Sequence, residues 1–149
     1  MCGIVGIIGW YKSYDEGKTK ITEMSERIHH RGPDDSGIWI DKKNLIYLGH
    51  KRLSIIDLSK SGSQPMTSKC GRYIIVFNGE IYNHLEIRID LENKYKIKWK
   101  GSSDTETLLE AISKNGIENT LKKIRGMFAF SIYDKKESTV FLARDRFGE

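Results

Sequence analysis

The sequence predicts an α+β fold in which strands pair mainly as hairpins and helices lie between them. Two pairs of strand-like runs are each joined by a short charged turn, at residues 41–44 and 134–137. Two other segments, residues 21–28 and 103–116, carry apolar residues at helical spacing. Strands and helices do not alternate one for one, as they would in a parallel α/β fold.

The chain opens with a strand followed by a helix. Residues 3–9 form a continuous apolar run, which we interpret as a buried strand. Ile21, Met24 and Ile28 are three and four residues apart, the spacing of one helix face. We expect this helix to end before the Arg-Gly-Pro of residues 31–33, because glycine and proline stop a helix.

The middle of the chain predicts further strands. Residues 37–40 and 45–48 flank the turn at 41–44 and read as a hairpin. A long turn-rich stretch over residues 57–70 leads to a strand at residues 72–77, which we expect to end at an Asn-Gly pair.

The segment after that pair carries signals for both a strand and a helix. Asn83 followed by Glu86 is related to the capping box that starts a helix. Alternating apolar residues instead favour a strand: Leu85, Ile87, Ile89 and Leu91. We favour the helix.

A capped helix and a hairpin complete the fold. Ser103 and Glu106 form a capping box at the start of the helix, and Gly116 occupies a typical C-terminal cap position. Residues 127–133 and 139–143 are predicted to be the strands of the closing hairpin.

Composition indicates a globular domain without a nucleic-acid surface. The 149 residues, 38% hydrophobic and 30% charged, are enough for one domain with its own core. The net charge of +5 is spread thinly along the chain. Only residues 94–100 alternate lysine with aromatic and apolar residues, which we interpret as a half-buried strand with lysines on its edge.

Other features favour a cytoplasmic protein without a membrane partner. No apolar run is long enough to cross a membrane, and no basic region precedes the first one as in a signal peptide. The two cysteines, Cys2 and Cys70, do not make a disulfide framework. The histidines lack ligand spacing, so we expect no metal site and assign them to loops or helix ends: His29, His30, His50 and His84.

The last residues read as the opening of another loop and strand. Residues 144–149 contain charged residues, a phenylalanine and a glycine, with no helix or strand terminator. We therefore expect the chain to be part of a longer protein.

Cys2 is the first candidate for catalysis. If Met1 is removed, the residue carries both a thiol and a free α-amine, so one residue supplies a nucleophile and a base. The alternative is a small apolar residue at the start of a strand.

Three further positions carry polar groups that suit catalysis or binding. Arg52 follows a strand and can hold a carboxylate, or it can simply face solvent. Asn78 and the Gly79 N–H can form an oxyanion hole, although Asn-Gly is also common in β-turns. Asp104 opens a helix, where a carboxylate either favours the helix or holds an ammonium group.

Taken together and in this order, the motifs resemble the N-terminal glutaminase domain of asparagine synthetases. These enzymes are class II glutamine amidotransferases of the N-terminal-nucleophile hydrolase superfamily. The resemblance covers residues 1–149 as one glutamine amidotransferase domain, incomplete at its C-terminus and without the synthetase domain. It rests on these segments: Cys2, Arg31-Gly32-Pro33-Asp34, Arg52-Leu53-Ser54-Ile55-Ile56-Asp57, Gln64-Pro65, Asn78-Gly79-Glu80-Ile81-Tyr82-Asn83 and Ser103-Asp104-Thr105-Glu106.

The resemblance implies roles for the residues that match. Cys2 would attack the side-chain amide of L-glutamine, and Asn78 with Gly79 would stabilise the oxyanion. Arg52 would bind the substrate α-carboxylate, with Leu53, Ser54, Ile55 and Ile56 lining the same wall. Asp104 and the Gly79-Glu80 segment would hold the α-ammonium group.

The resemblance also implies a fold and partners. The fold would be a four-layer αββα sandwich of two antiparallel sheets, truncated at the C-terminus. Ammonia would pass to an ATP-activated aspartate on a C-terminal synthetase domain, where ATP and Mg²⁺ would bind; this segment itself needs no cofactor. A homodimer, a related amidotransferase that amidates a sugar or polysaccharide precursor, and a non-catalytic regulatory module stay open.

Overall fold

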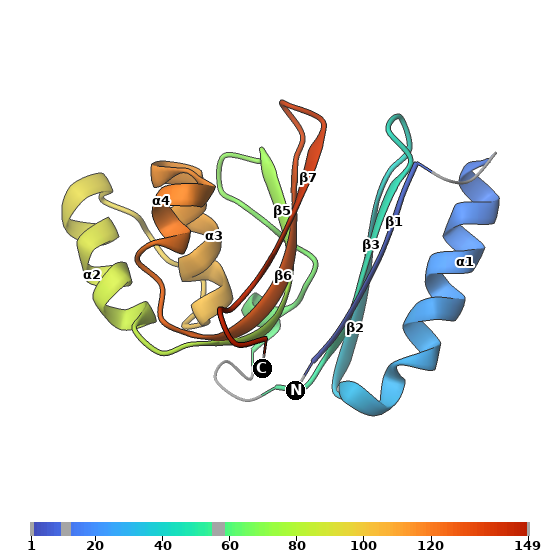
Figure 1. Ribbon diagram of the computed structural model, residues 1–149, viewed down its shortest axis with the longest axis horizontal. Coiled ribbons are helices and arrows are strands. Elements are labelled where there is room, and N and C mark those ends of the chain that lie inside the picture. Colours follow the sequence, from blue (N-terminus) through green and yellow to red (C-terminus); the bar gives the residue numbers. More distant parts are fainter. Residues whose placement is uncertain (1, 10–12, 55–58, 149) are drawn as a thin grey trace.

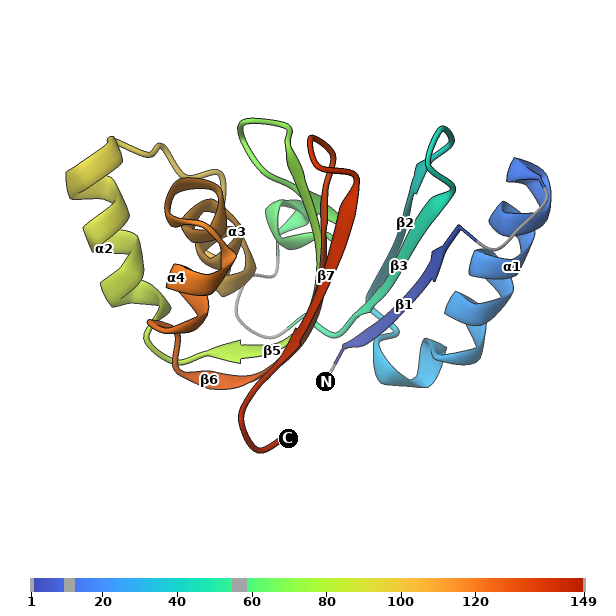
Figure 2. The same ribbon diagram turned by 45° about the horizontal axis from the view of Figure 1, so that its top comes forward.

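The computed structural model describes residues 2–9, 13–54 and 59–148. In this part of the chain, two antiparallel sheets face each other between helices, as the sequence predicts (Figure 1). Helix α1 (Tyr14–Arg27) covers the outer face of the first sheet. The other helices cover the outer face of the second sheet, and Figure 2 shows the same order of layers from a turned view.

The first sheet contains β1 (Gly3–Ile8), β2 (Asp35–Asp41) and β3 (Ile46–Arg52) in the order β1-β3-β2. The expectation that the first apolar run is a buried strand is only partly correct. β1 is an edge strand, and Ile8 at its end is 54% exposed.

The buried strand of this sheet is β3, which continues to Arg52 beyond its predicted end at residue 48. All of its residues are buried, including the polar ones at its end. Each of these polar side chains has a partner, since His50 contacts Phe77 O, Lys51 binds Glu26 and Arg52 binds Ser59 O.

Helix α1 ends before the Arg-Gly-Pro segment, as the sequence predicts, but begins at Tyr14, seven residues before the first residue of the predicted apolar pattern. The Ser13 hydroxyl accepts a hydrogen bond from Glu16 N and so caps the first turn. Ile21 is fully buried against the sheet. The helix ends at Arg27 and passes into the short 3₁₀ helix η1 (His29–Arg31) before the Gly-Pro pair.

The second sheet contains β4 (Met66–Thr67), β5 (Tyr73–Ile81), β6 (Gly126–Asp134) and β7 (Thr139–Arg144), in that order. The closing hairpin between β6 and β7 is confirmed. β5 is longer than predicted, because the chain continues through the Asn-Gly pair without turning. Residues 57 and 58 of the predicted turn-rich stretch lie outside the described residues.

The segment with mixed signals is helix α2 (His84–Tyr95), as favoured. Ile87 packs against the core and Leu91 is buried, whereas Leu85 and Ile89 are exposed, so the alternation reflects two helix faces. Asn83 precedes the helix but does not cap it with its side chain. Instead its amide donates to Lys123 O and accepts from Arg125 N.

The predicted strand over residues 94–100 is wrong. Lys94 and Tyr95 end α2, and Lys96 terminates it in the left-handed conformation (φ 55°). Tyr95 donates to Asn115 on α3, and the Arg88 guanidinium lies 4.1 Å from the centroid of the Trp99 ring. The aromatic residues therefore pack against helices rather than in a sheet.

Helix α3 (Asp104–Asn115) confirms the predicted capped helix, and the short helix α4 (Ile117–Leu121), which the sequence analysis missed, follows directly. The Ser103 hydroxyl caps α3 by accepting from Glu106 N. Glu106 accepts instead from Lys100 N and Gly101 N, so it fixes the preceding loop.

The core has one layer between the two sheets and a further layer between each sheet and the helices that cover it. The layer between the sheets is formed by Ile46, Leu48, Ile74, Val76 and Tyr133. His50 continues this layer from β3 and is fully buried, so its expected loop or helix-end position is wrong. In the described ranges, we find no helix with the length and apolar character needed to cross a membrane.

Candidate active site

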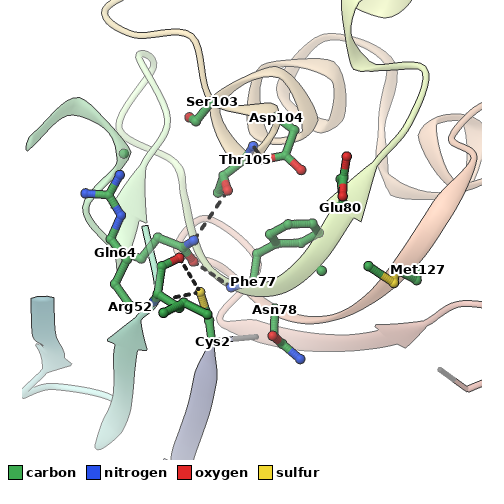
Figure 3. Close-up of a pocket in the computed structure, with 13 residues that line it drawn as sticks. Cys2, Arg52, Gln64, Phe77, Asn78, Glu80, Ser103, Asp104, Thr105 and Met127 are labelled. Carbon is green, nitrogen blue, oxygen red and sulfur yellow. Dashed lines mark hydrogen bonds between the residues drawn. The ribbon is translucent and has the colours of Figure 1, made fainter. Parts of the chain in front are cut away.

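One pocket collects most of the residues that the sequence analysis selected (Figure 3). It lies where the start of β1, the end of β3, the C-terminal part of β5 and the N-terminus of α3 meet. Its lining residues are Cys2, Arg52, Leu53, Gly62, Gln64, Phe77, Asn78, Gly79, Glu80, Ser103, Asp104, Thr105 and Met127. Ser54 is not among them, and Ile55 and Ile56 lie outside the described residues.

Cys2 directly precedes β1 and is partly buried. Its Sγ accepts from Leu53 N at 3.3 Å and lies 3.6 Å from Leu53 O. The thiol is therefore held against the segment that follows β3.

The loop formed by residues 31–34 holds both of these segments. Arg31 Nε donates to Cys2 O at 3.1 Å, and Asp34 accepts from Ser54 N at 2.7 Å. A Cβ at Gly32 would lie 2.4 Å from the Lys51 carbonyl group, so only glycine allows this close approach. The loop therefore positions the nucleophile candidate as well as joining a helix to a strand.

Arg52 is buried at the pocket wall, with 7% of its surface exposed. Its Nη1 donates to Ser59 O at 2.8 Å, which orients the guanidinium beside the 3₁₀ helix η2 (Lys60–Gly62). The alternative of a solvent-facing charge does not hold for this side chain.

Asn78 and Gly79 belong to β5 and pair with Ala129 and Phe128, so they do not form a β-turn. Gly79 has φ +151°, and a Cβ there would lie 2.2 Å from Met127 O. Both the conformation and the close strand neighbour therefore require glycine. The Asn78 Oδ1 is buried and has no hydrogen-bond partner among the described residues.

Asp104 is the first residue of α3 and is buried, with 5% of the residue exposed. One oxygen accepts from Ile81 N at 3.0 Å and the other from Thr105 N at 2.8 Å. Burial raises the pKa of this carboxyl above its ordinary value, although the two backbone N–H groups oppose that effect. In Figure 3 the Glu80 carboxylate lies on the same side of the pocket as Asp104.

The sequence analysis missed the polar and apolar residues that complete the wall. Gln64 is 7% exposed, donates to Thr105 Oγ1 at 3.3 Å and accepts from Phe77 N at 2.6 Å. Met127 lies opposite in Figure 3. The Gln64-Pro65 pair was a sequence signal for the family, but nothing in the residue types indicated that this amide reaches the pocket.

The collected groups suit the cleavage of a polar amide. A thiol and an asparagine amide line the same pocket as a guanidinium from β3 and two carboxylates, one from β5 and one from α3. Such a site can attack a carbonyl carbon and hold a zwitterion by both charges. Within residues 2–9, 13–54 and 59–148, no group of three or more metal-ligating side chains is close enough to hold a metal ion.

Comparison with known proteins connects this geometry to one family. A model of the glutamine amidotransferase domain family matches residues 1–149. A putative glutamine-hydrolysing asparagine synthetase 2 of Methanocaldococcus jannaschii is 42% identical over 164 residues, with 99% of this chain and 30% of that protein covered. The glutamine-hydrolysing asparagine synthetase 1 of Bacillus subtilis is 41% identical over 151 residues, with 99% and 23% covered.

A solved structure shares the fold. The glutamine phosphoribosylpyrophosphate amidotransferase of B. subtilis, complexed with ADP and GMP, superposes with a TM-score of 0.75 at 21% identity. The match covers 99% of this chain and 38% of that one. The chain spans roughly a quarter to a third of the length of the curated relatives it matches, which are therefore much longer proteins.

Proposed function

The chain belongs to the glutamine amidotransferase domain family, and on that premise we propose that it releases ammonia from L-glutamine with Cys2 as the nucleophile. The observation that carries this proposal is the single pocket that holds Cys2, Arg52, Asn78 and Asp104. These side chains come from distant parts of the sequence. Their groups complement the α-carboxylate, the α-ammonium group and the side-chain amide of one amino acid.

The reaction begins with the thiol of Cys2. Removal of Met1 frees the α-amine, which accepts the thiol proton while Sγ attacks the side-chain amide carbon of glutamine. The tetrahedral intermediate collapses when the amine returns the proton to the leaving nitrogen, so that ammonia departs and a thioester remains. Water then hydrolyses the thioester, which gives glutamate and restores the thiol.

Asn78 and Gly79 act on the charge that develops during this attack. The Asn78 amide and the Gly79 N–H donate to the oxyanion, and losing one such donor typically costs about 2.7–4 kcal/mol of transition-state stabilisation. Gly79 is held in its conformation by the Met127 and Phe128 backbone, so its N–H has a fixed direction.

The remaining charges select the substrate. Arg52 pairs with the α-carboxylate, and Asp104 with Glu80 holds the α-ammonium group. A simple amide lacks both charges and would leave the buried Arg52 and Asp104 without substrate partners, which disfavours its binding.

The asparagine synthetase relatives support a proposal for the ammonia acceptor. We propose that ammonia passes to an ATP-activated aspartate on a C-terminal synthetase domain, with ATP and Mg²⁺ bound there. This rests on the identity to those relatives and on their greater length.

Covalent labelling of the full-length polypeptide tests the proposal. A diazo-ketone analogue of glutamine should add once to a chain whose intact mass lacks Met1, and excess glutamine should block the addition. Cys2→Ala should abolish both labelling and glutamate release while thermal unfolding stays close to wild type.

The other cysteine supplies the matched control. Cys70 is exposed and does not line the pocket. Cys70→Ala should therefore keep full labelling and turnover. Glutamate release by the Cys2→Ala variant would show that the proposed nucleophile is wrong.

A further inference from the structure

The backbone of Phe77 directly precedes the two proposed oxyanion donors, and it lacks a strand neighbour on one side. β4 pairs only with Ile74 and Ile75, so that edge of β5 is uncovered at Phe77. An N–H and a C=O buried there need partners from elsewhere, because an unpaired buried backbone group is costly.

Two buried side chains supply these partners. Gln64 Oε1 accepts from Phe77 N at 2.6 Å, and His50 Nε2 lies 3.2 Å from Phe77 O. A carbonyl oxygen can only accept, so His50 carries its proton on Nε2. Burial lowers the pKa of His50 to about 4, which keeps the imidazole neutral and this tautomer intact near neutral pH.

The bond from His50 also joins the two halves of the site. His50 lies on β3 and pairs with Ile4 on β1, two residues after Cys2. Phe77 lies on β5 of the opposite sheet, next to Asn78. One hydrogen bond therefore connects the sheet that carries the nucleophile to the strand that carries the oxyanion donors.

The Asn78 side chain depends on this backbone for its placement. Its Oδ1 is buried and has no hydrogen-bond partner among the described residues. Because no bond from the described residues fixes this oxygen, the position of the strand determines where the amide points.

We propose that His50 is a positioning residue: its bond to Phe77 O sets the backbone of β5 so that Asn78 and Gly79 meet the oxyanion formed at Cys2. Gln64 holds the other backbone polar group of the same residue, the Phe77 N–H. The inference rests on the proposed glutaminase function and adds a residue that does not touch the substrate.

Two substitutions by amide side chains of different length test whether a donor must reach Phe77 O. In His50→Gln the side-chain nitrogen occupies about the place of Nε2 and keeps the donor, whereas in His50→Asn it ends near Nδ1 and cannot reach Phe77 O. We expect His50→Asn to lower kcat for glutamate release by about 10- to 100-fold, because oxyanion stabilisation of this size is lost when a donor is misplaced. The KM for glutamine should stay within about threefold of wild type, because the groups that bind both substrate charges are unchanged.

A tetrahedral-state probe distinguishes positioning from general destabilisation. An aldehyde analogue of glutamine adds the Cys2 thiol and forms a hemithioacetal whose oxygen occupies the oxyanion position. Its affinity should fall in His50→Asn by the same factor as kcat and return within about threefold of wild type in His50→Gln. Tyr133→Phe removes a different hydrogen bond between the sheets, the one to Asp41, and should change neither kcat nor the affinity for the aldehyde analogue.

The outcomes are distinct for the two levels of the proposal. Wild-type protein without Cys2-dependent turnover would overturn the proposed function and this inference with it. If the wild type is active, two results would overturn the positioning role alone. One is an unchanged kcat in a folded His50→Asn variant, and the other is an equal loss of kcat in Tyr133→Phe. If His50→Asn does not fold, Gln64→Met removes the acceptor for Phe77 N and should lower the affinity for the aldehyde analogue. Unchanged affinity in that variant would contradict the proposal that bonds to the Phe77 backbone position the oxyanion donors.

Discussion

The Asp104 carboxylate combines a structural task and a proposed binding task that one substitution can separate. It accepts from Ile81 N and Thr105 N, so Asp104→Ala would leave the buried Ile81 N–H without its partner. Asp104→Asn keeps one acceptor and the side-chain volume but removes the charge. We expect the KM for glutamine to rise by about 10- to 100-fold, the worth of a charge-assisted hydrogen bond of about 1.5–3 kcal/mol.

A second buried carboxylate on the same helix is the control for this prediction. Glu110 is 2% exposed and accepts from Lys69 N, but it does not line the pocket. Steady-state kinetics of Glu110→Gln should show an unchanged KM. A rise in KM that is equal in the two variants would assign the effect of Asp104 to folding.

The residues of the site differ in how far the sequence could predict them. Cys2, Asn78 and Asp104 have reactive or charged groups next to strand or helix signals, and they lie around one pocket. Gln64 and Met127 have no such signal, because their place depends on how distant segments pack. The catalytic and binding roles stay predictions that the substitutions above test.

The stability of the fold should depend on pH, because strand β3 contains the buried His50. Burial is the main cause of the lowered pKa of His50, Arg52 lowers it further, and the Phe77 carbonyl and Asp35 oppose it. Above pH 6.5 the imidazole is neutral in both the folded and the unfolded chain and contributes nothing. Below pH 6.5 the unfolded chain binds a proton that the folded chain does not bind until about pH 4, so stability falls as the pH falls.

The size of this effect follows from the two pKa values, about 6.5 unfolded and about 4 folded. The free energy of unfolding should drop by about 2 kcal/mol between pH 7 and pH 5 through this group alone. Urea unfolding of wild type and His50→Gln at pH 7, 6 and 5 measures it as the difference between the two curves. Parallel curves would show that His50 is not kept neutral by burial.

The element boundaries show why pattern alone misplaced some segments. β3 reads as a strand only to residue 48, because Gly49 to Arg52 look polar; the partners that bury them come from α1, β5 and the loop before η2. Residues 94–100 alternate like a strand, yet Tyr95 and Trp99 contact helices. Helix α3 was predicted well because its cap and apolar face are local signals.

At the scale of the whole molecule, the site depends on how the two sheets face each other. Cys2 precedes β1 of the first sheet, and Asn78 lies on β5 of the second. In Figure 1 the N-terminus lies at one end of the sandwich, and the β2–β3 and β6–β7 turns lie at the other. A four-layer arrangement could be inferred from the family resemblance, but no strand pattern specifies the distance between sheets.

The sheets are joined at the end with the turns by a buried phenol. Tyr133 on β6 donates to Oδ2 of Asp41, the last residue of β2, at 2.9 Å and accepts from Nδ2 of Asn44, in the turn before β3, at 2.8 Å. Burial alone raises the pKa of Asp41, but the hydrogen bonds from Asn44, Tyr133 and Lys43 outweigh it and the pKa is lowered. The carboxylate is therefore charged when it accepts from Tyr133.

Tyr133→Phe removes this link without changing the ring that packs in the core. We expect the free energy of unfolding to fall by about 1.5–3 kcal/mol, the range for a hydrogen bond to a charged group. The kinetic constants for glutamine should not change, because the lost bond lies at the opposite end of the sandwich from Cys2.

Urea unfolding together with glutaminase assays would measure both effects. Tyr82 is 59% exposed, so Tyr82→Phe is the matched control and should stay within about 0.5 kcal/mol of wild type. Equal stability of the two variants would mean that the bond from Tyr133 adds nothing to the contact between the sheets. A loss of kcat in a stable Tyr133→Phe would mean instead that the alignment of Cys2 with Asn78 depends on contacts along the whole length of the sandwich.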